Sequence, residues 1–354
     1  MKMQTHKKDE MTPIERGKAI AVGSAYDRIP CFPFIEEISG KLIGVPVEEY
    51  CHNADDIVQS EIAAFHRLGH DIVGTGPNTC GIAEAIGAPI IYSKVALPHV
   101  GEPFLMDYEM LSQMDILNPS KDGRLPMYLE AIEKLTQAAE EVVAVSSSMG
   151  GPFTIASQLR GIEQFLKDCR REPERVHELM RFVTDSTKMC IDAVAPFGVV
   201  IAFADPVACP NMISPKCYET FVLPYMKELV QYSIQKTGKK PSLHMCGDTH
   251  KIWPYLKELS ISGLSLDNLI DMKIAREELG HTFAILGNVP PVEVVLDGTK
   301  EEIFASVKQC IEDSIESEKG YTLTTGCDVP YQTAFEKLDW FMEAGRLYGR
   351  RDSV

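Results

Sequence analysis

The stretch Pro241-Ser242-Leu243-His244-Met245-Cys246-Gly247-Asp248-Thr249-His250 has the pattern of a short strand that enters a glycine turn, with a helix from about residue 251. Alternate side chains of a strand share a face, so His244 and Cys246 are expected to point the same way. Their β-carbons would lie about 6–7 Å apart. Ligand bonds of about 2.0–2.3 Å then let an imidazole and a thiolate converge on one zinc ion.

A third metal ligand has to come from elsewhere in the chain. Cys327 stands in a similar setting, where a strand runs into Thr325-Gly326-Cys327-Asp328-Val329-Pro330. One histidine and two cysteines leave a tetrahedral zinc ion one open position, as a catalytic zinc requires. A His-x-Cys pattern alone is weak, because most intracellular cysteines are small buried hydrophobes. The place of these segments in the fold therefore has to decide whether the cysteines are metal ligands or buried hydrophobic residues.

The same strand–turn–helix unit recurs along the chain and predicts an α/β protein with a parallel sheet. Eight units favour a closed (β/α)8 TIM barrel, with an extra N-terminal helix and an irregular excursion after the second strand. The 354 residues are expected to form a single barrel domain in which residues 1–11 are disordered or peripheral. The expected strands are 29–34, 71–75, 142–148, 199–206, 241–246, 263–268, 283–291 (running into a Pro-rich turn) and 321–325; the main helices are 12–22, 55–68, 127–140, 155–168, 173–195, 214–236, 299–318 and 332–348, and the excursion is 82–125.

The carboxyl ends of the strands form the working face of such a barrel. The candidate ligands His244, Cys246 and Cys327 all fall at strand ends, which strengthens the prediction of a zinc site. Small or polar residues gather there: Asn78, Ser147, Ser148, Asp205, His244, Cys246, Asp267, Asn288, Cys327 and Asp328.

Composition excludes several other classes of function. A formal net charge of −16 disfavours nucleic acid and anionic membranes as partners. Ten cysteines without a close pairing pattern are typical of a reducing cytoplasm. The polar N-terminus lacks the apolar core of a signal peptide, and no apolar run approaches the ~20 residues of a membrane span. No Gly-x-Gly-x-x-Gly opens a helix, so dinucleotide binding has no support.

The charge of the ligands favours one kind of chemistry. Two thiolates and one imidazole would leave the zinc site nearly neutral, a poorer activator of water than three neutral histidines. Such a site suits a substrate thiol, whose proton would be released near neutral pH while the sulfur stays nucleophilic. Alkyl transfer to a thiol is the reaction class that follows.

Six landmarks are spread over nearly the whole chain: Thr12-Pro13-Ile14-Glu15-Arg16, Gly151-Pro152-Phe153-Thr154, Ser214-Pro215 through Leu223-Pro224-Tyr225, His244-Met245-Cys246-Gly247, Gly287-Asn288-Val289 and Gly326-Cys327-Asp328-Val329-Pro330. In these landmarks the chain resembles the uroporphyrinogen decarboxylase superfamily, and within it the methylcobamide:coenzyme M methyltransferase branch. That resemblance implies a cytoplasmic, zinc-dependent barrel enzyme. It would move a methyl group from a methylcobamide, carried by a corrinoid partner protein, to a small thiol such as coenzyme M. The zinc motif of that branch maps onto His244, Cys246 and Cys327.

Two alternatives remain open. A uroporphyrinogen decarboxylase would grip the substrate carboxylates with an arginine-bearing N-terminal segment, but residues 35–40 are Ile-Glu-Glu-Ile-Ser-Gly. A non-catalytic protein could instead use the barrel mouth to bind a corrinoid protein. The acceptor thiol, the original methyl donor and the oligomeric state cannot be read from the sequence.

The remaining strand-end residues have both functional and structural interpretations. Asp205, Asp267 and Asn288 are candidate catalytic residues that could take up the thiol proton, orient His244 or shape the pocket. The two carboxylates could equally cap helices or hold loops. Candidates to contact the cofactor are Asn78, Ser147, Ser148 and Asp328. His250 is a candidate fourth ligand or a surface residue, and Cys80 is a strand-end thiol without partner spacing.

Overall fold

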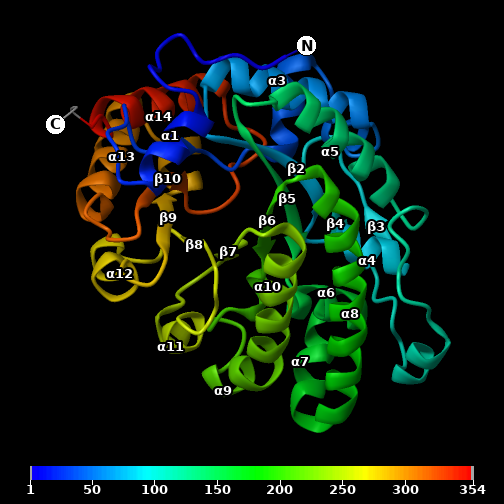
Figure 1. Cartoon of the computed structure of the whole chain (residues 1–354). Coiled ribbons are helices and arrows are strands. Elements are labelled where there is room, and N and C mark those ends of the chain that lie inside the picture. The colour runs from blue at the N-terminus through cyan, green and yellow to red at the C-terminus, as the bar shows by residue number, and fades with distance from the viewer. Residues whose placement is uncertain (1, 352–354) are drawn as a thin grey trace. The chain divides into compact units, whose positions relative to one another are not determined.

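The structure is a computed structural model that describes residues 2–351 (Figure 1), and these residues divide into two compact units. Unit 1 comprises residues 2–74, 133–145 and 263–351, and unit 2 comprises residues 75–132 and 146–262. No helix of residues 2–351 has both the length and the apolar character needed to cross a membrane. The prediction of a single barrel domain stays a prediction.

The sheet of unit 2 has four strands, in the order β2 (Ile72–Asn78), β5 (Ala144–Gly150), β6 (Val200–Ala204) and β7 (Ser242–Met245). Its register brings Gly150, Ala204 and His244 into one row at the carboxyl ends. Along β7, the side chains alternate between fully buried Leu243 and Met245 and partly exposed Ser242 and His244. This alternation confirms the strand predicted from the sequence around His244.

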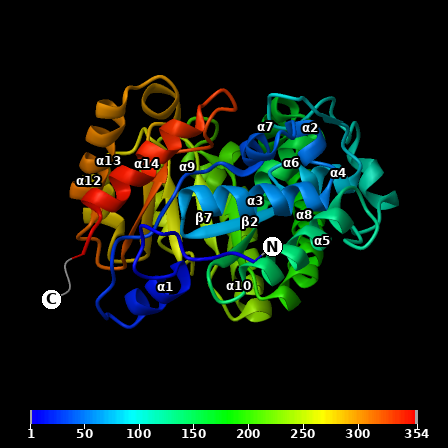
Figure 2. The same cartoon turned by 90° about the horizontal axis from the view of Figure 1, so that it is seen from above.

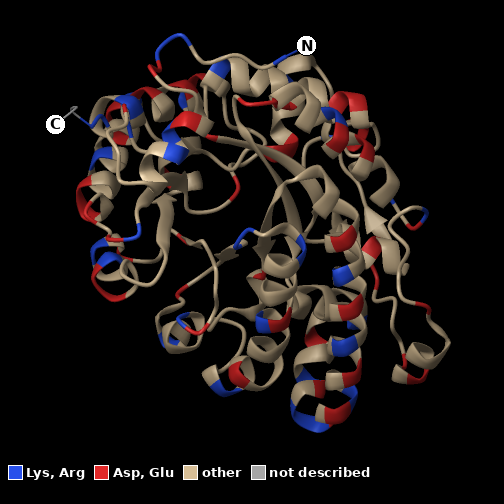
Figure 3. Ribbon diagram, in the orientation of Figure 1, with Lys and Arg blue, Asp and Glu red and all other residues tan. Residues whose placement is uncertain are grey.

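The helices of unit 2 agree with the prediction except at one break. The helix expected over 155–168 is divided at Gly161, where φ is +82° and the chain turns from α6 (Pro152–Arg160) into α7 (Ile162–Arg171). A long α8 (Pro173–Val194) lies side by side with α10 (Leu223–Thr237) (Figure 1). The α10 helix continues α9 (Pro215–Cys217) and a π-helical turn, η5 (Tyr218–Val222), without interruption. On α7 and α8, basic and acidic residues are interspersed (Figure 3).

The predicted excursion after the second strand, β2 (Ile72–Asn78), contains only short elements. A two-stranded antiparallel ribbon pairs β3 (Ile90–Ile91) with β4 (His99–Val100). The excursion ends before α5 (Leu125–Ala139). The other short elements of unit 2 are α4 (Gly81–Ile86), η2 (Tyr108–Gln113), η3 (Ala195–Phe197), η4 (Pro206–Ala208), η6 (His250–Ile252) and α11 (Trp253–Leu256).

Unit 1 has four parallel strands in the order β1 (Cys31–Phe32), β10 (Tyr321–Thr325), β9 (Ala284–Val289) and β8 (Gly263–Leu266). The first of these covers only two of the residues expected over 29–34. Proline cannot donate to a strand ladder, and Pro30 and Pro33 flank the two paired residues.

Helices surround these strands, and α13 and α14 lie side by side in both Figure 1 and Figure 2. The first helix begins as expected: Thr12 and Glu15 form a capping box, in which each side chain bonds the backbone N–H of the other residue. The helical elements of unit 1 are α1 (Pro13–Ala21), η1 (Glu36–Ile43), α2 (Val47–Tyr50), α3 (Ala54–Leu68), α12 (Met272–Leu279), η7 (Pro291–Leu296), α13 (Lys300–Ser314) and α14 (Phe335–Tyr348).

The N-terminal residues, for which disorder or a peripheral place was expected, are anchored in unit 1. Met3 is only 3% exposed, and its N–H donates to the carbonyl of Ala138 at 2.9 Å. The Asp9 carboxylate accepts hydrogen bonds from two guanidinium groups, those of Arg28 and Arg346. These contacts tie residues that precede the first helix to the last helix of the chain.

A buried network of charges joins α1 to the segments that flank β1 and β2. The Arg16 side chain has no exposed surface; it donates to Asp27 at 2.7 and 2.8 Å and also bonds Asp71. Arg28 donates to the second oxygen of Asp71 at 2.6 Å, and to Asp9. Because buried charges are tolerated only when paired and hydrogen-bonded, this network fixes the packing of α1.

Candidate metal centre

The two ligand candidates in unit 2 lie close together. His244 ends the ladder of β7, Cys246 follows the strand, and the His244 Nε2 atom is 3.3 Å from the Cys246 Sγ atom. Both side chains are partly exposed. A shared position 2.0–2.3 Å from a nitrogen and from a sulfur, about the bond lengths of zinc, is compatible with this separation. The structure therefore brings together the pair on which the sequence hypothesis rests.

The turn after Cys246 is held by a residue that the sequence argument did not single out. Gly247 has φ +76°, and a β-carbon there would lie 2.4 Å from the Asn211 Oδ1 atom. The same oxygen accepts the N–H of Asp248 at 3.0 Å. Only glycine fits this close approach, which explains the Cys-Gly order. No sequence pattern connects Asn211 with the turn, because the two segments meet only through folding.

The face of the unit 2 sheet that bears His244 carries small side chains. In the register, Ser148 pairs with Ala202, and Ala202 pairs with Ser242, two residues before the row that contains His244 and on the same face. The opposite face carries large apolar groups such as Phe203 and Met245, which are buried. Small side chains therefore border His244 along this face of the sheet.

Cys327 occupies the corresponding place in unit 1, two residues after β10. The N–H of Gly326 donates to the carbonyl of Val289 at 2.9 Å, which continues the pairing with β9. A β-carbon on Gly326 would lie 2.5 Å from the backbone nitrogen of Asn268, so a larger residue is excluded. This close approach fixes the backbone immediately before Cys327, whose side chain is partly exposed.

Asp205 is fully buried and acts as a hydrogen-bond acceptor for the start of α6. Its Oδ1 atom accepts the N–H of Thr154 at 2.8 Å and the hydroxyl of Thr154 at 2.6 Å. Burial raises the pKa of Asp205 to about 6, although the hydrogen bonds from Thr154 oppose the rise. Its backbone N–H donates to the carbonyl of His244 at 3.2 Å. These contacts agree with the capping alternative; the catalytic role stays a prediction.

The raised pKa of Asp205 predicts a specific pH dependence of stability. Because the ordinary pKa is 3.8 and the folded value is about 6, its stabilising contribution is complete below pH 4 and is lost as the pH rises through 6. Asp205→Asn removes the ionisation. The unfolding free energy of the variant minus that of wild type is therefore expected to rise by about 2–3 kcal/mol when the pH is raised from 4 to 8. Urea unfolding at both pH values measures this change; a difference between the two proteins that does not vary with pH would contradict it.

Asn288 and Asp267 hold one loop of unit 1 together. The Asn288 side-chain amide donates to the carbonyl of Asp267 at 2.9 Å and to that of Ile270 at 2.7 Å. The Asp267 carboxylate accepts the N–H of Leu269 at 2.9 Å. Asn288 is 5% exposed. The contacts agree with the structural alternatives that the sequence left open, and catalysis by either residue stays a prediction.

Replacing Asn288 by alanine is expected to lower the free energy of unfolding by about 1–3 kcal/mol, because two carbonyl groups lose their donor in a buried setting. Asn268→Ala nearby is the matched control, with an expected change within about 0.5 kcal/mol. Denaturant unfolding of wild type, Asn288→Ala and Asn268→Ala measures these differences in unfolding free energy. Equal stability of the two variants would show that the amide contributes nothing.

The four candidates for contact with the cofactor differ in their surroundings. Ser148 donates its hydroxyl to the Asn78 side-chain oxygen, and both residues are partly exposed. Ser147 is fully buried on the opposite face of β5, and within residues 2–351 its hydroxyl has no hydrogen-bond partner. Asp328 is exposed. Contact of these residues with a cofactor stays a prediction.

Two further candidates are engaged in local contacts. His250 Nδ1 lies 2.6 Å from an oxygen of Asp248, and its ring packs 4.2 Å from that of Trp253. This pairing supports the surface interpretation of His250. The buried thiol of Cys80 points to the carbonyl of Pro98 at 3.7 Å.

Comparison with known proteins places the fold and then the family. A solved structure of a methyltransferase from Methanosarcina mazei superposes with a TM-score of 0.85 at 24% identity, covering 96% of this chain and 99% of that chain. The fold is thus a (β/α)8 barrel, as predicted. The profile of the uroporphyrinogen decarboxylase (URO-D) family matches residues 12–348. The chain belongs to this family, which confirms the predicted resemblance.

The similar proteins include methyltransferases and decarboxylases. A methylated-thiol–coenzyme M methyltransferase of Methanosarcina mazei is 26% identical over 348 residues, covering 95% of this chain and 89% of the relative. A methylcobamide:CoM methyltransferase of the same organism is 28% identical over 347 residues, with 96% and 99% covered. A uroporphyrinogen decarboxylase of Trichodesmium erythraeum is 24% identical over 306 residues, with 84% of each covered.

Proposed function

We propose that the protein is a zinc-dependent methyltransferase that moves a methyl group from a methylated corrinoid, carried by a partner protein, to a small thiol. Its zinc ligands would be His244, Cys246 and Cys327. The observation that carries the proposal is the 3.3 Å approach of His244 Nε2 to Cys246 Sγ beyond the end of β7. The methylcobamide:CoM methyltransferases among the relatives support the same reaction.

The donor set suits the proposed metal. His244 and Cys246 of unit 2 would supply one imidazole nitrogen and one thiolate, and Cys327 of unit 1 would supply a second thiolate. Two sulfurs and one imidazole nitrogen are ligands that zinc prefers, and three protein ligands leave one position open. When bound there, zinc would act as a Lewis acid that lowers the pKa of a substrate thiol.

The chain's own residues would hold this arrangement in place. Asn211 fixes the turn behind Cys246, and the Asp205 N–H holds the His244 carbonyl at the strand end. Gly326 sets the backbone that leads to Cys327. The small residues on the His244 face of the sheet would leave the space needed by a thiol and an approaching methyl group. Precise placement of reacting groups is a major source of rate enhancement.

One contact weakens the decarboxylase alternative. A porphyrinogen carries several carboxylates and needs cations to bind it, yet the segment after β1, η1 (Glu36–Ile43), contains Glu36 and Glu37 and one cation, Lys41. The Lys41 ammonium donates to the carbonyls of Tyr331 and Thr333 at 2.7 and 3.0 Å. The cation of this segment is thus used within the protein.

The test is demethylation of methylcobalamin with coenzyme M as the thiol, followed by the absorbance change of the corrinoid. Turnover is expected with zinc-loaded protein and should disappear after zinc removal by a chelator and return on zinc addition. Turnover that is independent of zinc would refute the proposal. Conversion of uroporphyrinogen by metal-free protein would establish the decarboxylase alternative instead.

A further inference from the structure

Two cysteines outside the proposed metal centre lie together in unit 2. Cys169 belongs to the last turn of α7, and Cys217 belongs to the first turn of the continuous helix that begins at Pro215. Both residues line one cavity, although 48 positions separate them in the sequence. Both side chains are partly exposed. Their spacing in the sequence matches no known motif, so only the folded chain brings them together.

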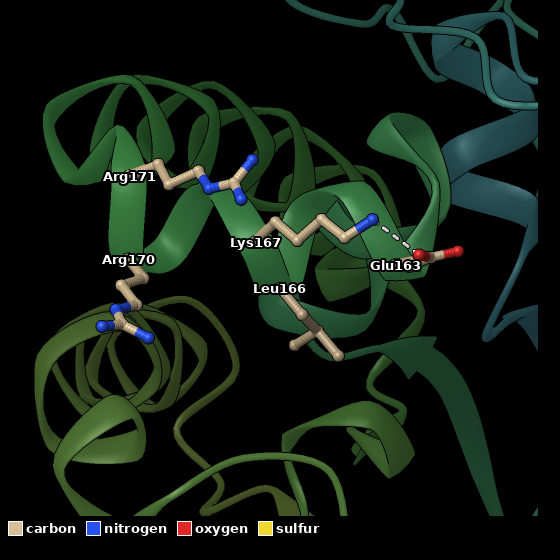
Figure 4. Close-up of a pocket in the computed structure, with 5 residues that line it drawn as sticks. All are labelled: Glu163, Leu166, Lys167, Arg170 and Arg171. Carbon is tan, nitrogen blue, oxygen red and sulfur yellow. Dashed lines mark hydrogen bonds and ion pairs between the residues drawn. The ribbon is translucent and has the colours of Figure 1, made fainter.

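The pair is open to small reagents. Cys169 and Cys217 line a cavity of about 530 Å³ between α7 and the start of α9, together with Arg170, Met212 and Lys216. Arg170 also lines a neighbouring pocket of about 730 Å³ on α7, where Lys167 is paired with Glu163 (Figure 4). In Figure 4 the Arg170 side chain points away from this ion pair. The cavity therefore combines two thiols with two cationic side chains, Arg170 and Lys216.

The environment makes the two sulfurs unequal. The hydrogen bond from Cys169 lowers the pKa of the Cys217 thiol, and the same bond raises the pKa of Cys169. Cys217 also lies near the positive end of the helix, where the Ser214 hydroxyl caps its backbone N–H at 3.1 Å. The thiolate is the form of cysteine that attacks disulfides, and a helix N-terminus favours it. Cys217 is thus suited to attack a disulfide, and Cys169 is suited to resolve the mixed disulfide that forms.

We propose that Cys169 and Cys217 are a redox-active thiol pair that a small disulfide, such as glutathione disulfide, converts into an intramolecular disulfide. The Cys217 thiolate attacks one sulfur of the oxidant, forms a mixed disulfide and releases one thiolate. Cys169 then gives up its proton, and its sulfur attacks Cys217 Sγ and releases the second thiolate. In sum, two protein thiols are oxidised to one disulfide, and one small disulfide is reduced to two thiols.

The position of the pair gives the new bond a structural consequence. It would link the last turn of α7 to the end of the segment 209–217. That segment also carries Asn211, which holds the Gly247–Asp248 turn next to Cys246. The pair thus lies on the structure that supports one half of the proposed metal centre, without belonging to it.

The test is peptide mapping of the full-length protein after equilibration with glutathione disulfide, acid quenching and tryptic digestion. The expected product is residues 168–170 joined to residues 217–227, reversible by dithiothreitol. The buried Cys190, whose pKa burial raises to about 12, is the internal control and should stay unmodified. Mixed disulfides at Cys169 or Cys217 without the link, or no reaction at either residue, would overturn the proposal. This readout does not depend on methyl transfer.

Two variants separate bond formation from activation of Cys217. Cys169→Ser keeps a hydrogen-bond donor but has no sulfur, so Cys217 should stop at the mixed disulfide while its alkylation rate stays near that of wild type. Cys169→Ala removes the donor; a one-unit rise in the pKa of Cys217 would slow its alkylation about tenfold at pH 7. Equal alkylation rates in all three proteins would refute the role of Cys169 in activating Cys217.

Discussion

Replacing Cys246 by serine is expected to abolish stoichiometric zinc binding and to lower kcat/KM for thiol methylation by more than about 10²-fold. Supporting residues around a metal site typically cost about 10–100-fold when mutated, so a larger loss distinguishes a ligand from a support. Serine is nearly isosteric, but its hydroxyl is a far weaker zinc ligand than a thiolate. Metal analysis of the purified variant, together with methylcobalamin demethylation, measures both effects.

Cys80→Ser is the matched control for this experiment. Cys80 also follows a strand of the sheet, β2, but it is buried against the carbonyl of Pro98. Its replacement is expected to leave about one zinc per chain and near wild-type turnover. If Cys246→Ser retained zinc and activity like the control, Cys246 would not be a ligand and the proposed reaction would lose its basis.

Replacing Arg16 by leucine is expected to reduce the free energy of unfolding by about 3–5 kcal/mol. The guanidinium is fully buried between Asp27 and Asp71, whose carboxylates are 8% and 7% exposed. Without the cation, the buried Asp27 carboxylate loses its guanidinium partner and the Asp71 carboxylate keeps only Arg28, where water cannot replace the lost contacts. The removal of one partner from a buried pair costs more than the pair itself contributes, because an uncompensated charge is left behind.

Arg67→Leu provides the comparison for Arg16. Arg67 pairs with Asp339 at 2.8 Å, but both side chains are about 40% exposed, at 41% and 39%. Exposed ion pairs contribute about 0–1 kcal/mol, so this variant should unfold almost like wild type. Urea unfolding followed by circular dichroism compares the three proteins. Similar losses for Arg16 and Arg67 would mean that burial does not set the cost of losing the cation.

The repeated pattern of strands and helices was sufficient to predict the fold class. The alternation of strand and helix signals is encoded within short windows, where peptide geometry and side-chain burial act locally. The errors fall where local signals are weak. Pro30 and Pro33 reduce β1 to two residues, and Gly161 divides a predicted helix into α6 and α7.

The candidate metal ligands were accessible to sequence reasoning for the same local reason. His244 and Cys246 are two residues apart on one strand, so alternation alone places them on one face. Asp205 shows the limit of this reasoning. Its position at a strand end was predicted, but the contact with Thr154 that buries and occupies its carboxylate depends on how α6 packs.

By itself, the sequence determined the order of the strands and helices, the face shared by His244 and Cys246, and the family to which the chain belongs. The tertiary structure alone decided that Asn211 supports the turn after Cys246, that Lys41 is bound by backbone carbonyls, and that Cys169 meets Cys217. The physical reason is the separation in sequence over which each interaction acts. Strand alternation and helix capping act between residues a few positions apart, whereas these contacts join distant segments that meet only when the apolar faces of the helices pack.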